Sequence, residues 1–195
     1  YTLGLPMADA PGTRALYCSA GINLLGAIVA TETHAPLGRY FDEHFAVPMQ
    51  FQNYEMWLMP KPPGEAYMAG GDRFRPRDFL KFGALLLNHG QWNGRKIVGA
   101  AWIAQSVVPR TAPEGEGDRY GYGWHLTTVT VDGRNYGVIN AGGNGGQLMV
   151  VIPSLDLAMM ITAGNYNQFP VWRTFLPKFV TAVVQSIPVG SDAAQ

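Results

Sequence analysis

Apolar residues recur at helical spacing along the first part of the chain. Because an α-helix turns once every 3.6 residues, apolar positions three and four residues apart line one of its faces. This pattern predicts four helices, over residues 21–33, 37–44, 76–87 and 100–108. The segments 1–16 and 109–119 lack such spacing and contain proline and glycine, so they predict loops.

The third predicted helix has the clearest end signals. Pro76 suits a first helical turn, where its missing N–H costs no hydrogen bond. Asp78 lies in the same turn, where the helix dipole favours a negative charge. Gly90 follows the last apolar position, as glycine commonly does after a helix. Asn93-Gly94 then predicts a tight turn between two short extended pieces.

The first predicted helix is dense in large aliphatic residues, which predicts a buried helix. Ser19 is placed to cap its N-terminus. The segment 47–70 shows no regular spacing, yet it carries many prolines, methionines and aromatic residues. Because so many large apolar groups are not kept in solvent, this segment predicts a long ordered loop rather than a linker.

Apolar runs in the second part of the chain are short and separated by turn residues, as in strands. The predicted strands cover residues 120–131, 135–139, 148–152 and 157–162. Asp132-Gly133 predicts a hairpin turn between the first two of them. An amphipathic helix is predicted over 170–186, and residues 190–195 predict a frayed tail.

The order of these elements predicts the fold class. Helices first, then a meander of strands and a covering helix, form an α+β pattern. We expect a mainly helical region with long loops over 1–119, and antiparallel strands with a C-terminal helix over 120–190.

A glycine cluster interrupts the strands at residues 140–147, Asn-Ala-Gly-Gly-Asn-Gly-Gly-Gln. Glycine weakens a strand, because it loses the most backbone entropy and packs no side chain. Two interpretations stay open. The cluster forms a bulge or tight turn at the edge of a sheet, or its bare backbone lies close to a ligand.

Composition excludes several classes of partner. Lys+Arg and Asp+Glu both number 14, so the chain lacks the basic excess of a nucleic-acid-binding protein. No apolar run reaches the 18 residues of a membrane-spanning helix. The single cysteine, Cys18, excludes an internal disulfide. Apolar residues make up 47% of the chain, enough to bury a sizeable core.

Common cofactor and metal motifs are missing from the sequence. His34, His44, His89 and His125 are scattered without the spacing of zinc ligands. Neither a nucleophile elbow, nor a phosphate-binding P-loop, nor a dinucleotide fingerprint occurs. We therefore expect no metal and no cofactor.

Two segments offer chemistry without a cofactor. Tyr17-Cys18-Ser19 precedes the first predicted helix, either as a cap with a packed tyrosine or as a source of a phenol for proton transfer. A phenol, with an ordinary pKa of about 10, acts as a base only when nearby cations lower that value. In the glycine cluster, a backbone N–H is suited to bind a developing oxyanion, provided that another segment supplies a nucleophile.

The order of several motifs resembles the serine β-lactamase-like hydrolases, which comprise class C β-lactamases, penicillin-binding DD-peptidases and related esterases. The resemblance spans about residues 1–186. It rests on segments similar to the family's HTSGLP, Tyr-x-Asn, GG…ARDLARFG and YGYGW motifs and its third motif, which here are Tyr1–Pro6, Tyr17–Ser19, Gly70–Gly83, Tyr120–Trp124 and Ala141–Gly146.

The resemblance implies an antiparallel sheet flanked by helices, beside a helical region. It implies a catalytic role for Tyr17 and Ser19, an oxyanion donor at the Asn144 N–H, and a substrate-binding edge at Ala141, Gly142 and Gly143. Relatives use the Ser of a Ser-x-x-Lys motif as nucleophile. No serine here has Lys three residues later, so we expect that motif upstream of Tyr1 and regard the chain as the C-terminal part of the enzyme, inactive alone.

Two positions depart from the family pattern. Ser19 stands where Asn is commoner, and Ala141 stands where Lys or His usually binds a substrate carboxylate. The implied activity is acyl-enzyme hydrolysis of a small ester, amide or peptide, with an ester or amide lacking a carboxylate as the favoured substrate. The alternative is a catalytically impaired relative that binds peptidoglycan-like or acyl ligands.

The resemblance also carries expectations about surroundings. It favours the periplasm or the cell exterior, whereas the sequence itself leaves the compartment open. A chain that lacks the nucleophile helix and further strands is expected to expose apolar surface, unless the N-terminal portion or another chain covers it.

Overall fold

The computed structural model describes residues 2–59, 65–112, 119–168, 171 and 174–188. Its first part is helical, with α1 (Ser19–Thr33), α2 (Leu37–Phe41), the π-helical turn η2 (Asp42–Ala46), α3 (Pro76–Leu87) and α4 (Ala100–Ser106). The strands β1 (Gln91–Trp92) and β2 (Arg95–Lys96) form a small hairpin between α3 and α4. A 3-10 turn, η1 (Thr2–Gly4), precedes the N-terminal loop. The predicted tail at 190–195 lies outside the described residues.

A five-stranded antiparallel sheet follows, in the order β3-β4-β5-β6-β7. Its strands are β3 (Arg119–Tyr120), β4 (His125–Val131), β5 (Arg134–Gly143), β6 (Gln147–Ile152) and β7 (Leu157–Ile161). Asp132-Gly133 forms the predicted two-residue turn, with φ of 49° and 78°. The four predicted strands become five because Gly121–Trp124 separate β3 from β4. The short turn η3 (Pro153–Leu155) joins β6 to β7.

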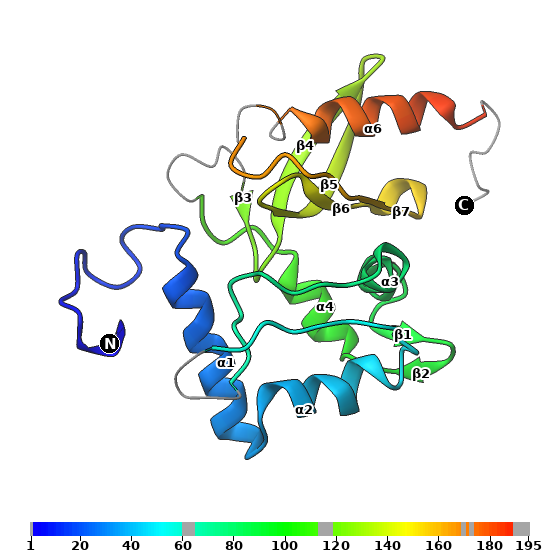
Figure 1. The fold of residues 1–195 in the computed structure, drawn as a ribbon. Helices are drawn as coiled ribbons and strands as arrows, with labels where there is room; N and C mark the ends of the chain where they lie inside the picture. The colour runs from blue at the N-terminus through cyan, green and yellow to red at the C-terminus, as the bar shows by residue number, and fades with distance from the viewer. Residues whose placement is uncertain (1, 60–64, 113–118, 169–170, 172–173, 189–195) are drawn as a thin grey trace.

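Helices cover both faces of the sheet, as Figure 1 shows with α6 on one side and α3 on the other. Helix α6 (Phe175–Ser186) buries Val180 against strand residues that include Val150 and Ile152, all fully inaccessible to solvent. On the opposite face, Leu86 of α3 packs with Ile139 and Val151. The arrangement confirms the predicted α+β fold, although α6 begins five residues after the predicted start at residue 170.

The side of α3 that faces away from the sheet meets a cluster of aromatic rings. Phe41 contacts five of the others, with ring centroids 5.4–6.4 Å away. The cluster comprises Phe41, Phe45, Phe51, Tyr54, Phe74, Phe79 and Phe82. Edge-to-face contacts dominate it, and each such pair adds about 0.5–1.5 kcal/mol beyond its buried area. These half-buried rings join α2, η2, the long loop and α3 in the helical region.

A buried ion pair ties the long loop to α3. Lys81 Nζ lies 2.7 Å from Asp78 Oδ1 and donates to the Gln50 carbonyl at 2.6 Å. Asp78 Oδ2 accepts from the Gln52 N–H at 2.9 Å. Burial raises the pKa of Asp78, but the hydrogen bonds from Lys81 and Gln52 and nearby positive charge outweigh it and hold that pKa below its usual value. Asp78 thus acts through this pair, beyond the helix-dipole role predicted for it.

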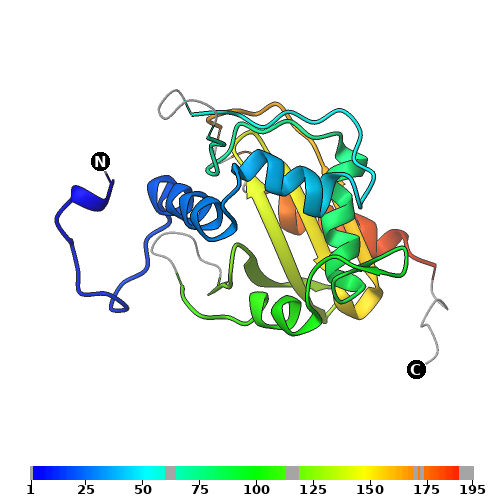
Figure 2. The ribbon, with the colours of Figure 1, turned by 90° about the horizontal axis from the view of Figure 1, so that it is seen from below.

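The predicted burial of the first helix is wrong. Leu25 and Ile28 of α1 are 53% and 56% exposed, and Gly26 is the buried residue of the helix. Ser19 is also not the cap, because α1 begins at Ser19 itself and Cys18 occupies the cap position without a side-chain hydrogen bond. Figure 2 shows α1 at one end of the molecule, with the N-terminal segment extending away from it.

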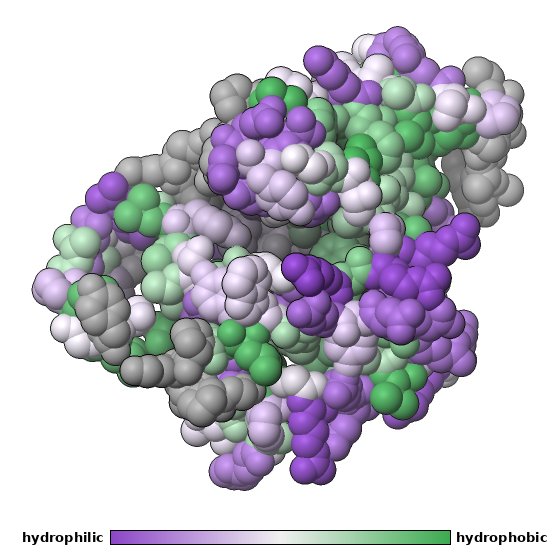
Figure 3. All heavy atoms as spheres, in the orientation of Figure 1, coloured by the Kyte–Doolittle hydropathy of each residue, from purple (hydrophilic) through white to green (hydrophobic). Residues whose placement is uncertain are grey.

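The exposed surface is chemically mixed. In the view of Figure 3, hydrophilic residues gather around α3 and the β1–β2 hairpin, and hydrophobic ones show over α6 and the sheet. Large apolar side chains in the N-terminal part are strongly exposed: Leu3, Leu5, Met7, Leu16, Leu25 and Ile28. Within the described residues, no helix is long and apolar enough to cross a membrane.

The predicted long loop at 47–70 is ordered where it is described. Its chain pairs with the segment before α3 through mutual backbone hydrogen bonds between Glu55 and Arg73. The Met68 N–H donates to Asn23 Oδ1 at 2.8 Å, which attaches the loop to α1. Residues 60–64 lie outside the described residues.

Replacing Asp78 with Asn tests the buried pair. The substitution leaves the Lys81 ammonium without its carboxylate, and we expect the free energy of unfolding at neutral pH to fall by about 3–5 kcal/mol. Because the folded state lowers this pKa, the stabilisation is complete above the ordinary aspartate value of about 3.9 and disappears as the pH falls through the lower folded value. Urea unfolding of both proteins across this acid range measures the effect.

The matched control is Asp42→Asn, because Asp42 is exposed at the end of α2. It should leave the urea midpoint nearly unchanged. A difference between wild type and Asp78→Asn that stays constant into acid would contradict the assignment.

Candidate active site

The end of β5 extends past its neighbour β4. Residues of β4 pair with β5 from Val131↔Arg134 to His125↔Asn140, where β4 begins. On its other side β5 remains paired with β6 as far as Gly143↔Gln147. Among the described strands, residues 141–143 therefore have a partner on the β6 side and none on the β4 side.

The backbone of Gly142 points toward this uncovered side. The Gly143 carbonyl accepts from the Gly146 N–H at 3.1 Å, so it faces into the β5–β6 hairpin. Because backbone groups of successive strand residues point to opposite edges, the N–H and C=O of Gly142 face the edge that β4 leaves open. Gly142 is exposed, in agreement with this direction.

The rest of the glycine cluster forms a braced hairpin turn. Asn144 Nδ2 donates to Asn167 Oδ1 at 2.9 Å, and Asn144 Oδ1 accepts from the Asn167 N–H at 2.8 Å. Gln147 exchanges two hydrogen bonds with the backbone of Ala163. A Cβ at Gly145, whose φ is 98°, would lie 2.9 Å from the Tyr166 ring. The cluster is thus a tight turn at the end of an interior strand, rather than at the edge of the sheet.

Tyr17 lies beside the strands at the point where β4 begins. Its ring centroid is 6.2 Å from that of His125 and 6.2 Å from that of Tyr120. Tyr120 and His125 are direct partners across β3 and β4, with centroids 5.0 Å apart. Since His125 is opposite Asn140, Tyr17 packs against the β4 residue of the last β4–β5 pair, after which β5 continues without β4. Tyr17 remains 53% exposed.

The structure places the other predicted site residues around this point. Ser19 is exposed at the first position of α1, two residues after Tyr17. Ala141 is half-buried on β5, one residue beyond the last β4 pair, and Gly142 and Gly143 complete the strand. Asn144 opens the turn, with its side chain engaged by Asn167. Asn140, which lies before these residues, is buried, and its Nδ2 donates to the His125 carbonyl at 3.3 Å.

Sequence reasoning missed His125 as a member of this site. The sequence analysis considered the histidines only as metal ligands, for which their spacing gave no motif. The available signal was the position of His125 directly after the Tyr120–Trp124 motif, at the start of a strand. Within the described residues, no group of three or more His, Cys, Asp or Glu side chains is arranged to hold a metal ion.

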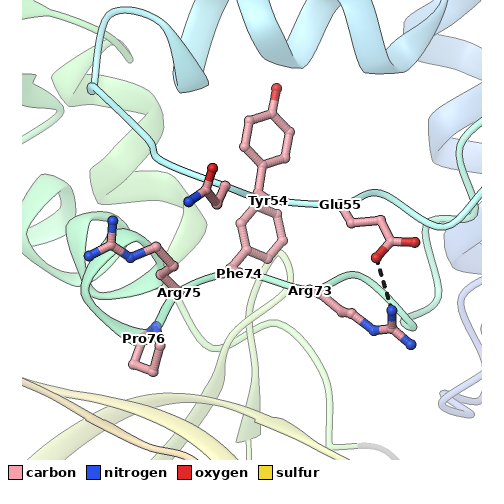
Figure 4. Close-up of a pocket in the computed structure, with 7 residues that line it drawn as sticks. Tyr54, Glu55, Arg73, Phe74, Arg75 and Pro76 are labelled. Atoms are coloured by element: carbon pink, nitrogen blue, oxygen red, sulfur yellow. Dashed lines mark hydrogen bonds and ion pairs between the residues drawn. The ribbon is translucent and has the colours of Figure 1, made fainter.

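Two surface hollows lie elsewhere. One is formed where residues 53–55 pair with residues 73–76 (Figure 4). There Tyr54 and Phe74 stack, and Glu55 accepts a hydrogen bond from Arg73 at 2.9 Å. This ion pair is solvent-exposed, and pairs of that kind contribute little stability. A second hollow lies over β4 and β5 and includes Arg119, Thr127 and Gly137, but none of the predicted site residues.

Comparisons with known proteins identify the fold. The structure is similar to a protein described as a 6-aminohexanoate-dimer hydrolase from Bacillus anthracis, with a TM-score of 0.75 and 19% identity over 94% of this chain and 47% of that one. It is also similar to simvastatin synthase (LovD) from Aspergillus terreus, with a TM-score of 0.72 and 17% identity over 95% of this chain and 57% of that one. A third similar structure is a penicillin-binding protein from Bacillus halodurans, with a TM-score of 0.65 and 17% identity. The match covers 89% of this chain and 59% of that one.

The chain spans about half to three-fifths of the length of these three structures. At such low identity, they establish a shared fold. No curated protein sequence matched the chain. The family model described as Beta-lactamase matches residues 1–171, which is most of the chain. With the fold and the order of motifs in agreement, the chain belongs to the beta-lactamase family.

Proposed function

We propose that this chain provides the tyrosine and the substrate-binding strand of a serine hydrolase that works through an acyl-enzyme. The observation that carries the proposal is the uncovered edge of β5 at Gly142, together with the packing of Tyr17 against His125, the last β4 residue that pairs with β5. An uncovered strand edge presents backbone N–H groups to a substrate carbonyl, and a phenol nearby can transfer a proton. The resemblance to a hydrolase of the 6-aminohexanoate dimer supports a reaction of this class.

The proposed nucleophile is the serine of a Ser-x-x-Lys motif that lies outside residues 1–195. Five serines occur in the chain, Ser19, Ser106, Ser154, Ser186 and Ser191, and none is followed by Lys three residues later. That serine oxygen attacks the substrate carbonyl carbon, and the leaving alcohol or amine departs with a proton. Water then releases the acid from the acyl-enzyme.

The backbone of the glycine turn is proposed to stabilise the oxyanion. Asn144 directly follows the exposed end of β5 and opens the turn, at the position where the family resemblance implies the oxyanion donor, so the Asn144 N–H is our choice of donor. The Asn167 contact holds Asn144 in place, which favours a donor fixed before the substrate binds. Removing one such donor from a hydrolase typically costs about 2.7–4 kcal/mol of transition-state stabilisation.

The favoured substrate is an ester or amide without a carboxylate next to the reacting bond. Position 141 holds the methyl group of alanine, which provides no positive charge for a carboxylate. Ser19 offers one hydroxyl, which is both a weak donor and an acceptor, in place of an amide with separate donor and acceptor groups. Both features reduce the recognition of a charged peptide end.

The same two residues motivate a second candidate function. A relative that binds peptidoglycan-like or acyl ligands without hydrolysing them needs the uncovered β5 edge but no activated nucleophile. Its Ser19 and Ala141 would then reflect the loss of catalytic groups. The presence or absence of a reactive serine separates the two functions.

A serine-directed fluorophosphonate probe tests the hydrolase directly. We expect the full-length protein to be labelled, because an activated serine attacks phosphorus as it attacks a carbonyl. Replacing the Ser-x-x-Lys serine with Ala should abolish labelling, and mass spectrometry of the labelled peptide locates the site. If labelling survives this substitution the assignment is wrong, and a folded wild type that takes no label supports the binding function.

Substitution of Tyr17 tests the proton transfer. In the full-length protein, Tyr17→Phe keeps the ring contacts with Tyr120 and His125 but removes the hydroxyl. We expect kcat for p-nitrophenyl butyrate to fall by about 10²–10⁴-fold, the usual contribution of a general acid–base group, with little change in KM. Tyr40→Phe, on the distant helix α2, is the control and should keep the wild-type kcat. Equal rates for both variants would rule out this role.

A lysine at position 141 tests substrate choice. Ala141→Lys places a cation on the substrate-binding strand, and a charge-assisted hydrogen bond is worth about 1.5–3 kcal/mol. We expect kcat/KM for a carboxylate-bearing ester to rise by about 10- to 100-fold relative to its neutral counterpart. Ala141→Met adds similar length without charge and should not change this ratio. A wild type that already prefers the carboxylate substrate would contradict the proposal.

A further inference from the structure

We propose that the hollow over β4 and β5 binds a small amphipathic anion, with a carboxylate at Arg119 and an apolar body against the sheet. This hollow is the one that includes Arg119, Thr127 and Gly137. Its residues on β5 end at Ile139, whereas the candidate active site begins at Ala141. This second site does not depend on the hydrolase function proposed above.

The floor of the hollow is formed by residues on one face of the sheet. Leu126 pairs with Ile139, and Thr128 pairs with Gly137, so these four residues lie on the same face. Arg119 of β3 pairs with Leu126 and therefore belongs to that face as well. The strand register thus brings an arginine beside an apolar stretch of β4 and β5.

The helices cover only part of this face. Leu86 of α3 packs with Ile139, and Leu126 packs against the same cluster. Thr128 and Gly137, which lie two pairs further along the hairpin, are exposed. A Cβ added at Gly137 would meet no atom within 4 Å among the described residues. The missing side chain at Gly137 therefore leaves room directly above the backbone.

Two further segments bound the open area. Val107 and Pro109 follow α4, and Pro153 and Ser154 belong to η3, which joins β6 to β7. Three of these four side chains are hydrocarbon, so the walls are mainly apolar. The hollow has a volume of about 660 Å³. Sites that hold small organic ligands measure about 300–1,000 Å³.

Arg119 gives the hollow its charge. Among the described residues that line it, Arg119 is the charged one, and none carries a carboxylate. The Arg119 side chain is exposed and forms no hydrogen bond or ion pair within the described part of the chain. Its guanidinium offers five N–H donors in a geometry that matches a carboxylate. Thr128 and Ser154, both exposed, provide hydroxyl groups at the rim.

A cation beside an apolar floor favours a ligand that has both kinds of group. An inorganic anion would leave Leu126 and the two prolines uncovered, and a neutral apolar molecule would leave the guanidinium without a partner. A carboxylate on a short aryl or alkyl body satisfies both. The carboxylate accepts two parallel hydrogen bonds from Arg119, and the body lies over Gly137, where the bare backbone allows close approach.

Equilibrium dialysis of the full-length protein against 4-phenylbutyrate tests the site. We expect saturable binding that weakens as salt is added, because salt screens an exposed charge. The neutral 4-phenylbutanamide should bind about tenfold more weakly, since it cannot form a charge-assisted hydrogen bond with Arg119. Treatment with excess fluorophosphonate should leave binding unchanged, because the hollow includes none of the candidate active-site residues.

Two substitutions separate the charge from the space. Arg119→Gln removes the charge, and we expect the affinity for 4-phenylbutyrate to fall about tenfold with that for the amide unchanged. Gly137→Leu fills the hollow from its floor and should abolish binding of both compounds. Because Gly137 has no positive φ and glycine weakens a strand, leucine is compatible with the fold there.

Each substitution has a matched control that should bind like wild type. Arg95→Gln removes an exposed arginine from β2. Gly38→Leu adds the same side chain on α2, where an added Cβ also meets no atom within 4 Å. Far-UV circular dichroism checks that every variant is folded, and if Gly137→Leu is not, the Arg119→Gln result decides.

The outcomes separate this site from the proposed hydrolase. A wild type without saturable binding of 4-phenylbutyrate overturns the proposal. So does a folded Gly137→Leu variant of wild-type affinity, or binding that fluorophosphonate removes, because the ligand then lies elsewhere. Equal affinities for the acid and the amide, or an unchanged Arg119→Gln variant, contradict the role of the charge. Binding by a protein that takes no fluorophosphonate label removes the hydrolase and leaves this site in place.

Discussion

Burial of α3 on two sides is the constraint on which the rest of the structure depends. One side approaches the sheet closely at Gly83, where an added Cβ would lie 3.0 Å from the Ala158 Cβ and 3.3 Å from Val151 Cγ2. The other side holds the aromatic cluster and the Asp78–Lys81 pair. Because packed interiors tolerate little change in volume, the helical region and the sheet are fixed relative to each other through this helix.

The site depends in turn on the register of β4 and β5, which is set at the far end of the hairpin. The turn at Asp132-Gly133 makes Val131 and Arg134 partners, and the same register then brings His125 opposite Asn140. A slip of one residue would turn every side chain of β4 to the other face of the sheet. A two-residue turn admits one register. This register places His125 against Tyr17 and lets β5 continue beyond the first residue of β4.

Local signals predicted most of the fold, and tertiary contacts explain what they missed. Pro76, Gly90 and Asp132-Gly133 act through the backbone conformation of their own neighbours, so their turns and helix ends could be predicted from a few residues. The burial of α1 could not, because a density of aliphatic residues does not say what covers them, and Leu25 and Ile28 face solvent among the described residues. The contact of His125 with Tyr17 joins segments more than a hundred positions apart and leaves no spacing to recognise.

The candidate site therefore consists of few side chains and a well-supported backbone. Gly142 contributes no side chain, and Asn144 and Gln147 direct theirs to Asn167 and Ala163, away from a catalytic task. The side chains of these two residues thus fix the turn, and the turn fixes the strand edge. A preorganised N–H needs no rearrangement when charge develops on a substrate, so in the proposed hydrolase this bracing contributes to catalysis. In the proposed hydrolase, the side chains that remain to take part in the chemistry are a serine nucleophile and the Tyr17 phenol, and the β4–β5 register sets the position of His125, against which the Tyr17 ring packs.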